Sequence, residues 1–459
     1  MRIPWAARAS EIWWIQGIPH FLGGRQQYMR YMNLRGWKRI SASVPLSELP
    51  PSTVIRILSC YSNFSSDQLQ QGNGGNLRLI SMVPTELQFT SKYPFFISTK
   101  TLFDKNNCDY RRFYPETHVV NSQETCLQLV DHIKKENNPE RIWFLKLPIE
   151  SFGRGIAVRK ANEALANELS SCEQFGTSST NSSSGRILFQ HGVENILKYA
   201  GRYTQGRAYI LISNYRYNAS TAWFFMGYFN VAAIMPLMTS NNNNGTGKDN
   251  NERHANMDSG NNTVSHQSHR PLVNKYTRAA HVTNLRSNQQ SKRLFFHQLL
   301  EGRTPEDMSL IYHHIKRAAL TSFLALKPSL ERHAADGSFS LIGFDYLIQT
   351  NLQVKVLETN CNCELFFDPS KFGKERVMSS TMLMDGMMDI VLASNLNPQE
   401  FGELLKKHLE ADVENRFKDP REALRADGGR YPGLGSWELI YSEAIEPVFQ
   451  YTDVFEKNC

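Results

Sequence analysis

The segment "GFDYLIQTNLQVKVLETNCN", residues 343 to 362, places two acids inside apolar runs that have the character of strands. Asp345 lies in the first run, Glu358 lies in the second, and the polar residues 349 to 353 between them indicate a hairpin turn. Alternate residues of a strand share a face, so Glu358 and Asn360 leave the same face and Asp345 can come alongside from the partner strand. Two carboxylates and an amide form a hard-oxygen site of the kind that Mg²⁺ uses together with substrate phosphates. The alternative is a pair of solvated acids on an edge hairpin.

The composition indicates a folded protein with several domains. The chain has 459 residues, and its hydrophobic and aromatic fractions of 41% and 11% exclude a chain that is disordered throughout. Its net charge of +7 suits an acidic partner surface but is too small to indicate nucleic acid by itself. No apolar run reaches membrane-spanning length, and the N-terminus lacks the apolar core of a signal peptide. We therefore expect a soluble cytoplasmic protein, with Arg2 and Arg8 leaving targeting to an organelle as an alternative.

The cysteines give no sign of a metal site. The seven are scattered along the chain, and Cys361 and Cys363 have no second pair at the spacing of zinc ligands. Their odd number and scattered positions predict reduced thiols, as in the cytosol.

Residues 239 to 269 are rich in asparagine and show no apolar periodicity. Such a tract cannot bury enough apolar area to offset the entropy of ordering it, so we expect a disordered surface insertion within a domain. On either side, the pattern predicts strands at 53–59 and 77–82, a helix at 308–326, and a methionine-rich helix at 380–394 that packs in the core.

A single lysine, Lys146, lies in the apolar strand-like run 142–148 and is followed by a loop that contains Gly153 and Gly155. Such a lysine usually extends its amino group to solvent. If it points into a cleft instead, it can bind a phosphate oxygen while the glycines let backbone N–H groups approach. The loop is not a Walker loop, because no Gly-Lys-Ser/Thr follows, and a plain hairpin turn is the alternative.

The order of strand lysine, glycine loop, helix, apolar strand and acidic hairpin resembles that of ATP-grasp ligases, and more narrowly the tubulin tyrosine ligase-like family. The similar stretches run in order from about residue 97 to the C-terminus. They are "FYPETHVV" (113 to 120), "WFLKLPIESFGRGI" (143 to 156), "HVTN" (281 to 284), "FGKERVMSSTMLMDGM" (372 to 387) and "GSWELIYS" (435 to 442).

The resemblance implies an α/β (α+β) ATP-grasp fold with two nucleotide-clamping subdomains and an N-terminal α/β domain. The expected units are an N-terminal domain (1–96), a central subdomain (97–191), a C-terminal subdomain that carries the insertion (192–395), and a helical segment with a tail (396–459).

The resemblance also implies a site that binds ATP and Mg²⁺. The residues expected to bind ATP are Lys100, Lys146, Arg154, Gly155, Gln190, His191, Gly192, Val193, Thr283 and Asn284. Of these, residues 190 to 193 are expected to form the hinge beside adenine, which we call the adenine hinge. Asp345, Glu358 and Asn360 would bind Mg²⁺, and Arg207 would be the catalytic residue that faces an acyl-phosphate.

By this resemblance the protein is an ATP-dependent ligase that adds an amino acid (glutamate, glycine or tyrosine) to a protein carboxylate. A substrate carboxylate attacks the γ-phosphorus of ATP, and an amine then attacks the acyl-phosphate. The expected partners are a free amino acid and the acidic tail of tubulin on microtubules, with no nucleic acid and no membrane. The expected location is the cytoplasm and its cytoskeleton, with a cilium or flagellum as a further option.

Two departures from the family pattern keep other functions open. Gln205 stands in place of an aspartate, and Asn230 stands in place of the arginine that holds the amino-acid carboxylate in the family. Arg202 or Arg216 could supply the missing charge. The alternatives are a catalytically degenerate member that binds nucleotide and microtubules or another protein, and a ligase that acts on a small molecule.

Overall fold

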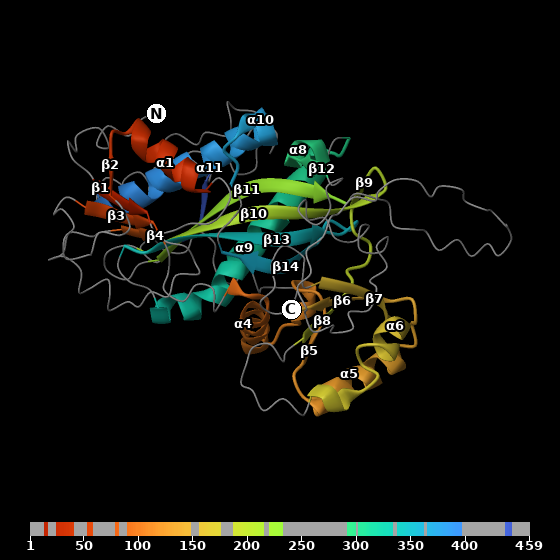
Figure 1. Ribbon diagram of the computed structural model, residues 1–459. Coiled ribbons are helices and arrows are strands. Elements are labelled where there is room, and N and C mark those ends of the chain that lie inside the picture. Colours follow the sequence, from red (N-terminus) through yellow and green to blue (C-terminus); the bar gives the residue numbers. More distant parts are fainter. Residues whose placement is uncertain are drawn as a thin grey trace, which may run out of the picture.

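The computed structural model describes part of the chain: residues 13–16, 24–40, 53–57, 79–81, 90–147, 156–175, 187–214, 220–232, 292–299, 302–333, 337–361, 365–396 and 437–442. The described residues form three β-sheets with helices packed on them (Figure 1). The predicted insertion at 239–269 lies outside these residues. None of the described helices is long and apolar enough to cross a membrane.

The largest sheet is antiparallel, and it contains the hairpin predicted from residues 343 to 362. The described strands follow the order β12-β11-β10-β13-β14, with β15 paired to β11 and β9 paired to β10. Their bounds are β9 Lys198–Tyr199, β10 Arg202–Asn214, β11 Ser220–Val231, β12 Lys292–Leu294, β13 Phe339–Ile348, β14 Val354–Asn360 and β15 Glu438–Ser442. The strands β13 and β14 are the predicted hairpin.

Helices cover both faces of this sheet because alternate residues of its long strands are apolar on both sides. Ala208 and Ile210 of β10 share a core with α9 (Pro305–His333). Tyr209 of the same strand shares the opposite core with α11 (Lys374–Leu396), where Met384, Met387 and Met388 are buried as predicted. Two short helices, α8 (Phe296–Leu299) and α10 (Pro369–Phe372), precede α9 and α11.

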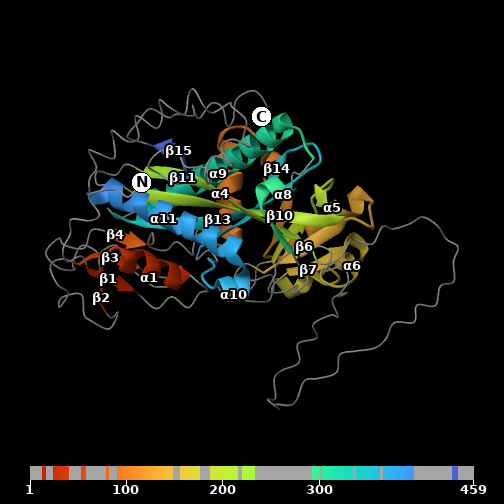
Figure 2. The same ribbon diagram turned by 90° about the horizontal axis from the view of Figure 1, so that it is seen from above.

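The N-terminal unit is a parallel sheet in the order β2-β1-β3-β4, packed beside α11 (Figure 2). Its elements are β1 (Trp13–Gln16), α1 (Gly24–Leu34), β2 (Lys38–Ile40), β3 (Thr53–Ile57) and β4 (Leu79–Ser81). The last two are the strands predicted at 53–59 and 77–82. Buried Gln27 of α1 donates to the Phe366 carbonyl over 2.6 Å, and Arg35 pairs with Asp389 over 2.7 Å. These contacts attach the N-terminal unit to α11 and to the segment just before α10.

The third sheet is antiparallel, in the order β5-β8-β6-β7, and it lies at the lower right of Figure 1. Its elements are β5 (Thr117–Val120), α5 (Gln123–Glu136), β6 (Ile142–Lys146), β7 (Ile156–Lys160), α6 (Ala161–Ala166) and β8 (Ile187–His191). The helix α4 (Lys92–Lys105) and the short turn η4 (Tyr110–Arg112) lead into it, and α4 packs on α9 and β14. This sheet therefore adjoins the acidic hairpin through α4. The predicted limits between domains stay predictions.

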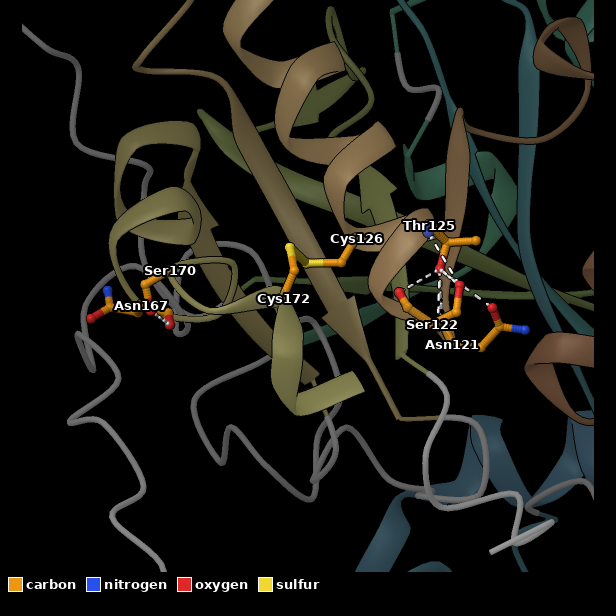
Figure 3. Close-up of a disulfide and its surroundings, with 7 residues drawn as sticks. All are labelled: Asn121, Ser122, Thr125, Cys126, Asn167, Ser170 and Cys172. Atoms are coloured by element: carbon orange, nitrogen blue, oxygen red, sulfur yellow. Dashed lines mark hydrogen bonds between the residues drawn. A yellow bond between two sulfur atoms is a disulfide. The ribbon is translucent and has the colours of Figure 1, made fainter. Parts of the chain in front are cut away.

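A disulfide corrects the expectation that the thiols are reduced. Cys126 of α5 and Cys172 of the turn η5 (Cys172–Phe175) are bonded, with Cα atoms 5.5 Å apart (Figure 3). The two cysteines are 46 residues apart in sequence, and only folding brings them within bonding distance. Close by, Ser122 caps α5 by accepting from the Thr125 N–H, while the Thr125 hydroxyl accepts from the Ser122 N–H.

Candidate active site

Four polar side chains form a row across neighbouring strands of the large sheet. Tyr228 of β11 is the register partner of Arg207 in β10, Arg207 pairs with Asp345 of β13, and Asp345 pairs with Glu358 of β14. Residues directly opposite each other in an antiparallel pair point to the same face, so the four side chains share one face. The sheet therefore places the predicted catalytic arginine next to two of the predicted metal ligands.

The guanidinium of Arg207 binds both carboxylate oxygens of Asp345. Its Nε donates to Oδ1 and its Nη2 donates to Oδ2 over 2.8 Å, while Asn360 Nδ2 also donates to Oδ2 over 3.3 Å. Burial raises the pKa of Asp345, and Arg207 opposes that shift. Burial acts to lower the pKa of Arg207, but the Asp345 carboxylate outweighs it and leaves that pKa above its ordinary value. The pair is a preorganised, charge-assisted fork.

Glu358 is partly buried and lies among cationic side chains. Lys92 Nζ lies 3.7 Å from Glu358 Oε2. Burial would raise the pKa of Glu358, but Lys92, Lys146 and Arg207 together outweigh it, so the pKa lies below its ordinary value. Glu358 is therefore ionised at neutral pH. Its Oε2 atom is buried and makes no hydrogen bond to the part of the chain that the structure describes.

The side chain of Lys146 reaches Glu358 and Asp345 from the third sheet. It is the last residue of β6 and only 5% exposed, which excludes the alternative in which its amino group extends to solvent. Burial lowers its pKa to about 8, with Glu358 opposing the shift and Lys92 adding to it. A buried lysine of this kind gains charge when an anion binds beside it.

The residues expected at the adenine hinge lie at the end of β8. Buried Gln190 donates from Nε2 to Thr117 Oγ1 over 3.3 Å. Beside it, Tyr114 donates its hydroxyl to the Leu357 carbonyl over 2.9 Å, next to Glu358. The hinge is thereby connected to the acidic strand.

The hinge continues through His191, Gly192 and Val193. Burial lowers the pKa of His191, which favours the neutral ring. A Cβ atom at Gly192 would lie 2.9 Å from the Ile142 carbonyl oxygen, which already accepts from the Gly192 N–H. This close approach leaves no room for a side chain at position 192 unless the backbone shifts.

The structure does not bring Lys100 to the row of polar side chains. Its amino group pairs with Asp104 over 2.6 Å, and its side chain is 45% exposed. The cation beside Glu358 is Lys92, eight residues earlier in α4, or about 12 Å along the helix. The signal for Lys92 is Ser91 at the N-cap followed by Pro94, which together mark the start of a helix. The expected residues Arg154, Gly155, Thr283 and Asn284 lie outside the described residues.

Arg293 of β12 is a cation that lies beside Asn230. Asn230 is the register partner of Arg293 in β12, and Arg293 Nε donates to Asn230 Oδ1 over 3.0 Å. The guanidinium lies over the Tyr228 ring at 4.1 Å and over the Phe366 ring at 4.4 Å. Two aromatic rings and one amide thus orient this arginine next to the row. Of the two cations expected to compensate for Asn230, Arg202 begins β10 and Arg216 lies outside the described residues.

Arg293 borders a cavity of about 520 Å³ between the large sheet and α11. The lining contains cations and aromatic rings but no acid among the described residues. The residues that line it are Tyr209, Tyr228, Arg293, Leu294, Phe295, Gln298, Phe366, Gly373, Lys374, Arg376, Ser379, Ser380 and Leu383. Since Tyr228 pairs with Arg207, the cavity adjoins the row of polar side chains. It is suited to an anionic ligand.

The site and fold define an ATP-grasp type of protein, and comparisons with known proteins agree. The chain is similar to the C-terminal domain of Pby1 from K. lactis, described as an ATP-grasp enzyme that interacts with the mRNA decapping enzyme Dcp2. The two share 17% identity with a TM-score of 0.51, over 84% of this chain and 94% of that one. The family model for the tubulin-tyrosine ligase family matches residues 78–368, more than half of the chain. A search of curated protein sequences found no match.

The chain therefore belongs to the tubulin-tyrosine ligase family, and its fold is that of an ATP-grasp enzyme. Family and fold together support an ATP-dependent ligase that uses ATP and a divalent metal. The donor set fits Mg²⁺, because Glu358 offers a buried oxygen that makes no hydrogen bond to the described residues. Asn360 offers an amide oxygen, and each Asp345 oxygen keeps lone pairs beside its bonds to Arg207.

Proposed function

We propose that this protein is an ATP-dependent ligase that joins a free amino acid to a carboxylate on an acidic protein tail, with tubulin as the acceptor. The observation that carries this proposal is the convergence of Lys146 from one sheet on Glu358 and Asp345 from another. A cation and two acids that meet from two different sheets are suited to a metal-bound polyphosphate.

In the proposed reaction, Lys146 and Lys92 hold phosphate oxygens, and Glu358, Asn360 and Asp345 hold Mg²⁺. The ion, when bound, would neutralise charge on the phosphates. Arg207 uses Nε and Nη2 to bind Asp345, which leaves Nη1 for an oxygen of the acyl-phosphate formed on the acceptor. The donor amine then attacks the acyl carbon, phosphate leaves, and an amide bond forms.

The cavity beside the row supports an anionic substrate. Arg293, Lys374 and Arg376 line it, and Arg293 is held in place by two aromatic rings. In our proposal Arg293 binds the α-carboxylate of the donor amino acid, in place of the arginine that the family has at position 230. Guanidinium and carboxylate match each other in a bidentate pair, which neither lysine nor asparagine reproduces.

A catalytically degenerate protein that binds nucleotide and microtubules is the second candidate. Gln205 and Asn230, which face each other across β10 and β11, favour it because both replace residues of the family pattern. Both candidates place the protein in the cytoplasm with the cytoskeleton.

The deciding experiment incubates the full chain with Mg²⁺-ATP, purified tubulin and each labelled amino acid in turn. Transfer of one label that depends on ATP and is lost in Lys146→Ala supports the ligase. Binding of ATP without transfer of any amino acid would support the degenerate protein instead. Absence of ATP binding would exclude both.

A further inference from the structure

A cluster of two histidines and one glutamate lies in the third sheet, away from the row of polar side chains. Glu116 immediately precedes β5, and His118 is two residues further along, so both side chains leave the same face of the strand. His132 comes from α5, which packs on β5. The three side chains are partly buried, with exposed fractions of 22%, 29% and 32%. The proposed ligase reaction uses none of them.

The spacing of the three ligand atoms is that of a metal centre. Glu116 Oε1 lies 3.3 Å from His118 Nε2 and 3.3 Å from His132 Nε2. All three atoms lie within 4.8 Å of one another. Tetrahedral ligands about 2.0 to 2.1 Å from Zn²⁺ are about 3.3 to 3.4 Å apart. One ion can therefore be reached by all three atoms with small adjustments.

Some buried polar atoms of this cluster make no hydrogen bond to the described residues. His118 Nε2 is hydrogen-bonded to Glu116 Oε1, but His132 Nε2 is buried and makes no hydrogen bond within the described part of the chain. Leaving a buried polar atom unpaired costs free energy. Glu136, one turn after His132, brings Oε1 to 3.6 Å from the same nitrogen, and its Oε2 is also buried without a hydrogen bond there. A cation at the centre would satisfy these atoms.

We propose that Glu116, His118 and His132 bind a divalent transition-metal ion of the zinc class, with Glu136 or a water as the fourth ligand. Two imidazoles and a carboxylate suit Zn²⁺ and its neighbours, whereas Mg²⁺ prefers oxygen ligands alone. This site is separate in chemistry from the site at Glu358. The nearby Arg141 is paired with both Glu136 and Glu194, so its charge is compensated.

The position of the cluster indicates what the ion would do. Thr117 lies between two of the ligands and accepts from Gln190, and the His191 N–H donates to the Glu116 carbonyl over 2.7 Å. Binding of the ion would hold β5 against α5 and fix the strand next to the expected adenine hinge. The metal would therefore stabilise the nucleotide-binding sheet without taking part in the reaction.

The test titrates the chelator-treated full chain with Zn²⁺, and separately with Co²⁺, in the presence of excess Mg²⁺. We expect one high-affinity equivalent that Mg²⁺ does not displace, a rise in melting temperature, and with Co²⁺ the strong visible absorption of a site with fewer than six ligands. His118→Gln and His132→Gln should each weaken Zn²⁺ binding at least tenfold and remove the rise in melting temperature. Glu358→Gln should leave Zn²⁺ binding unchanged.

His313→Gln, on the exposed face of α9, is the matched control, and it should bind Zn²⁺ as the wild type does. Circular dichroism verifies that each variant is folded. No tight equivalent in the wild type would overturn the proposal, as would equal affinity in wild type, His118→Gln and His132→Gln. Because Zn²⁺ binding is measured without nucleotide or tubulin, it is independent of ligase activity.

Discussion

The two ends of the candidate active site differ in how they relate to the family pattern. At the end expected to bind phosphate, here called the phosphate end, the fold brings Lys146, Asp345, Glu358 and Asn360 together. At the cavity end, Asn230 stands in place of an arginine, and Arg293 lies against it from the next strand. The difference teaches that an arginine on a register partner lies on the same sheet face as position 230, because side chains of paired residues share a face.

The largest expected effect is at the phosphate end. Glu358→Gln keeps the size of the side chain but removes a metal carboxylate, so we expect nucleotide affinity to become insensitive to Mg²⁺ and turnover to fall about 100-fold or more. Titration of ATP with and without Mg²⁺ measures this. Unchanged Mg²⁺-dependent affinity would place the metal elsewhere.

Lys146→Met should weaken ATP binding about 10- to 100-fold, because a charged hydrogen bond contributes about 1.5 to 3 kcal/mol. The methionine retains most of the apolar volume of the stem, which separates loss of charge from loss of packing. Calorimetric titration with ATP measures the effect. Unchanged ATP affinity in Lys146→Met would show that Lys146 makes no phosphate contact.

The same lysine gives the site a pH dependence. Its pKa is lowered to about 8 by burial in the free protein, and a bound phosphate would raise that pKa again. ATP binding should therefore take up a proton, and affinity should fall as pH rises from 7 to 9. In the Lys146→Met variant this part of the dependence should disappear. Binding measured across that range, in buffers with different ionisation enthalpies, reports the proton uptake.

At the cavity end, Arg293→Gln should raise the KM for the donor amino acid about 10-fold or more while ATP affinity stays unchanged, because a charge-assisted pair is lost. Adding Asn230→Arg to that variant should restore incorporation, since the two positions are register partners. Asn230→Arg alone should give no gain, because the new guanidinium would be repelled by Arg293. A gain from the single substitution would show that Arg293 does not bind the donor.

The smallest effects compare two lysines of one helix. Lys92→Ala should weaken ATP binding about threefold to tenfold, because Lys92 lies beside Glu358 at the margin of the site. Lys100→Ala should leave ATP affinity unchanged, since it removes only an exposed ion pair with Asp104. Such pairs contribute about 0 to 1 kcal/mol. If Lys100 rather than Lys92 affects ATP, the helix is oriented differently in the bound state.

The sequence by itself determined the acidic hairpin, its turn and the common face of Glu358 and Asn360, because strand periodicity and turn composition are local properties. It also indicated Lys146, since a lone lysine in an apolar strand is visible without any contact. The roles of the expected ATP and metal ligands all stay predictions, and four of these residues, Arg154, Gly155, Thr283 and Asn284, lie outside the described residues.

Only the tertiary structure decided which side chains from separate elements meet. Lys92 reaches Glu358 from another helix, Arg293 reaches Asn230 from a strand 63 residues away, and Cys126 finds Cys172 across 46 residues. Each of these contacts depends on how separate elements pack. Packing is set by the shape of buried surfaces along the whole chain, so no local pattern around either partner contains it.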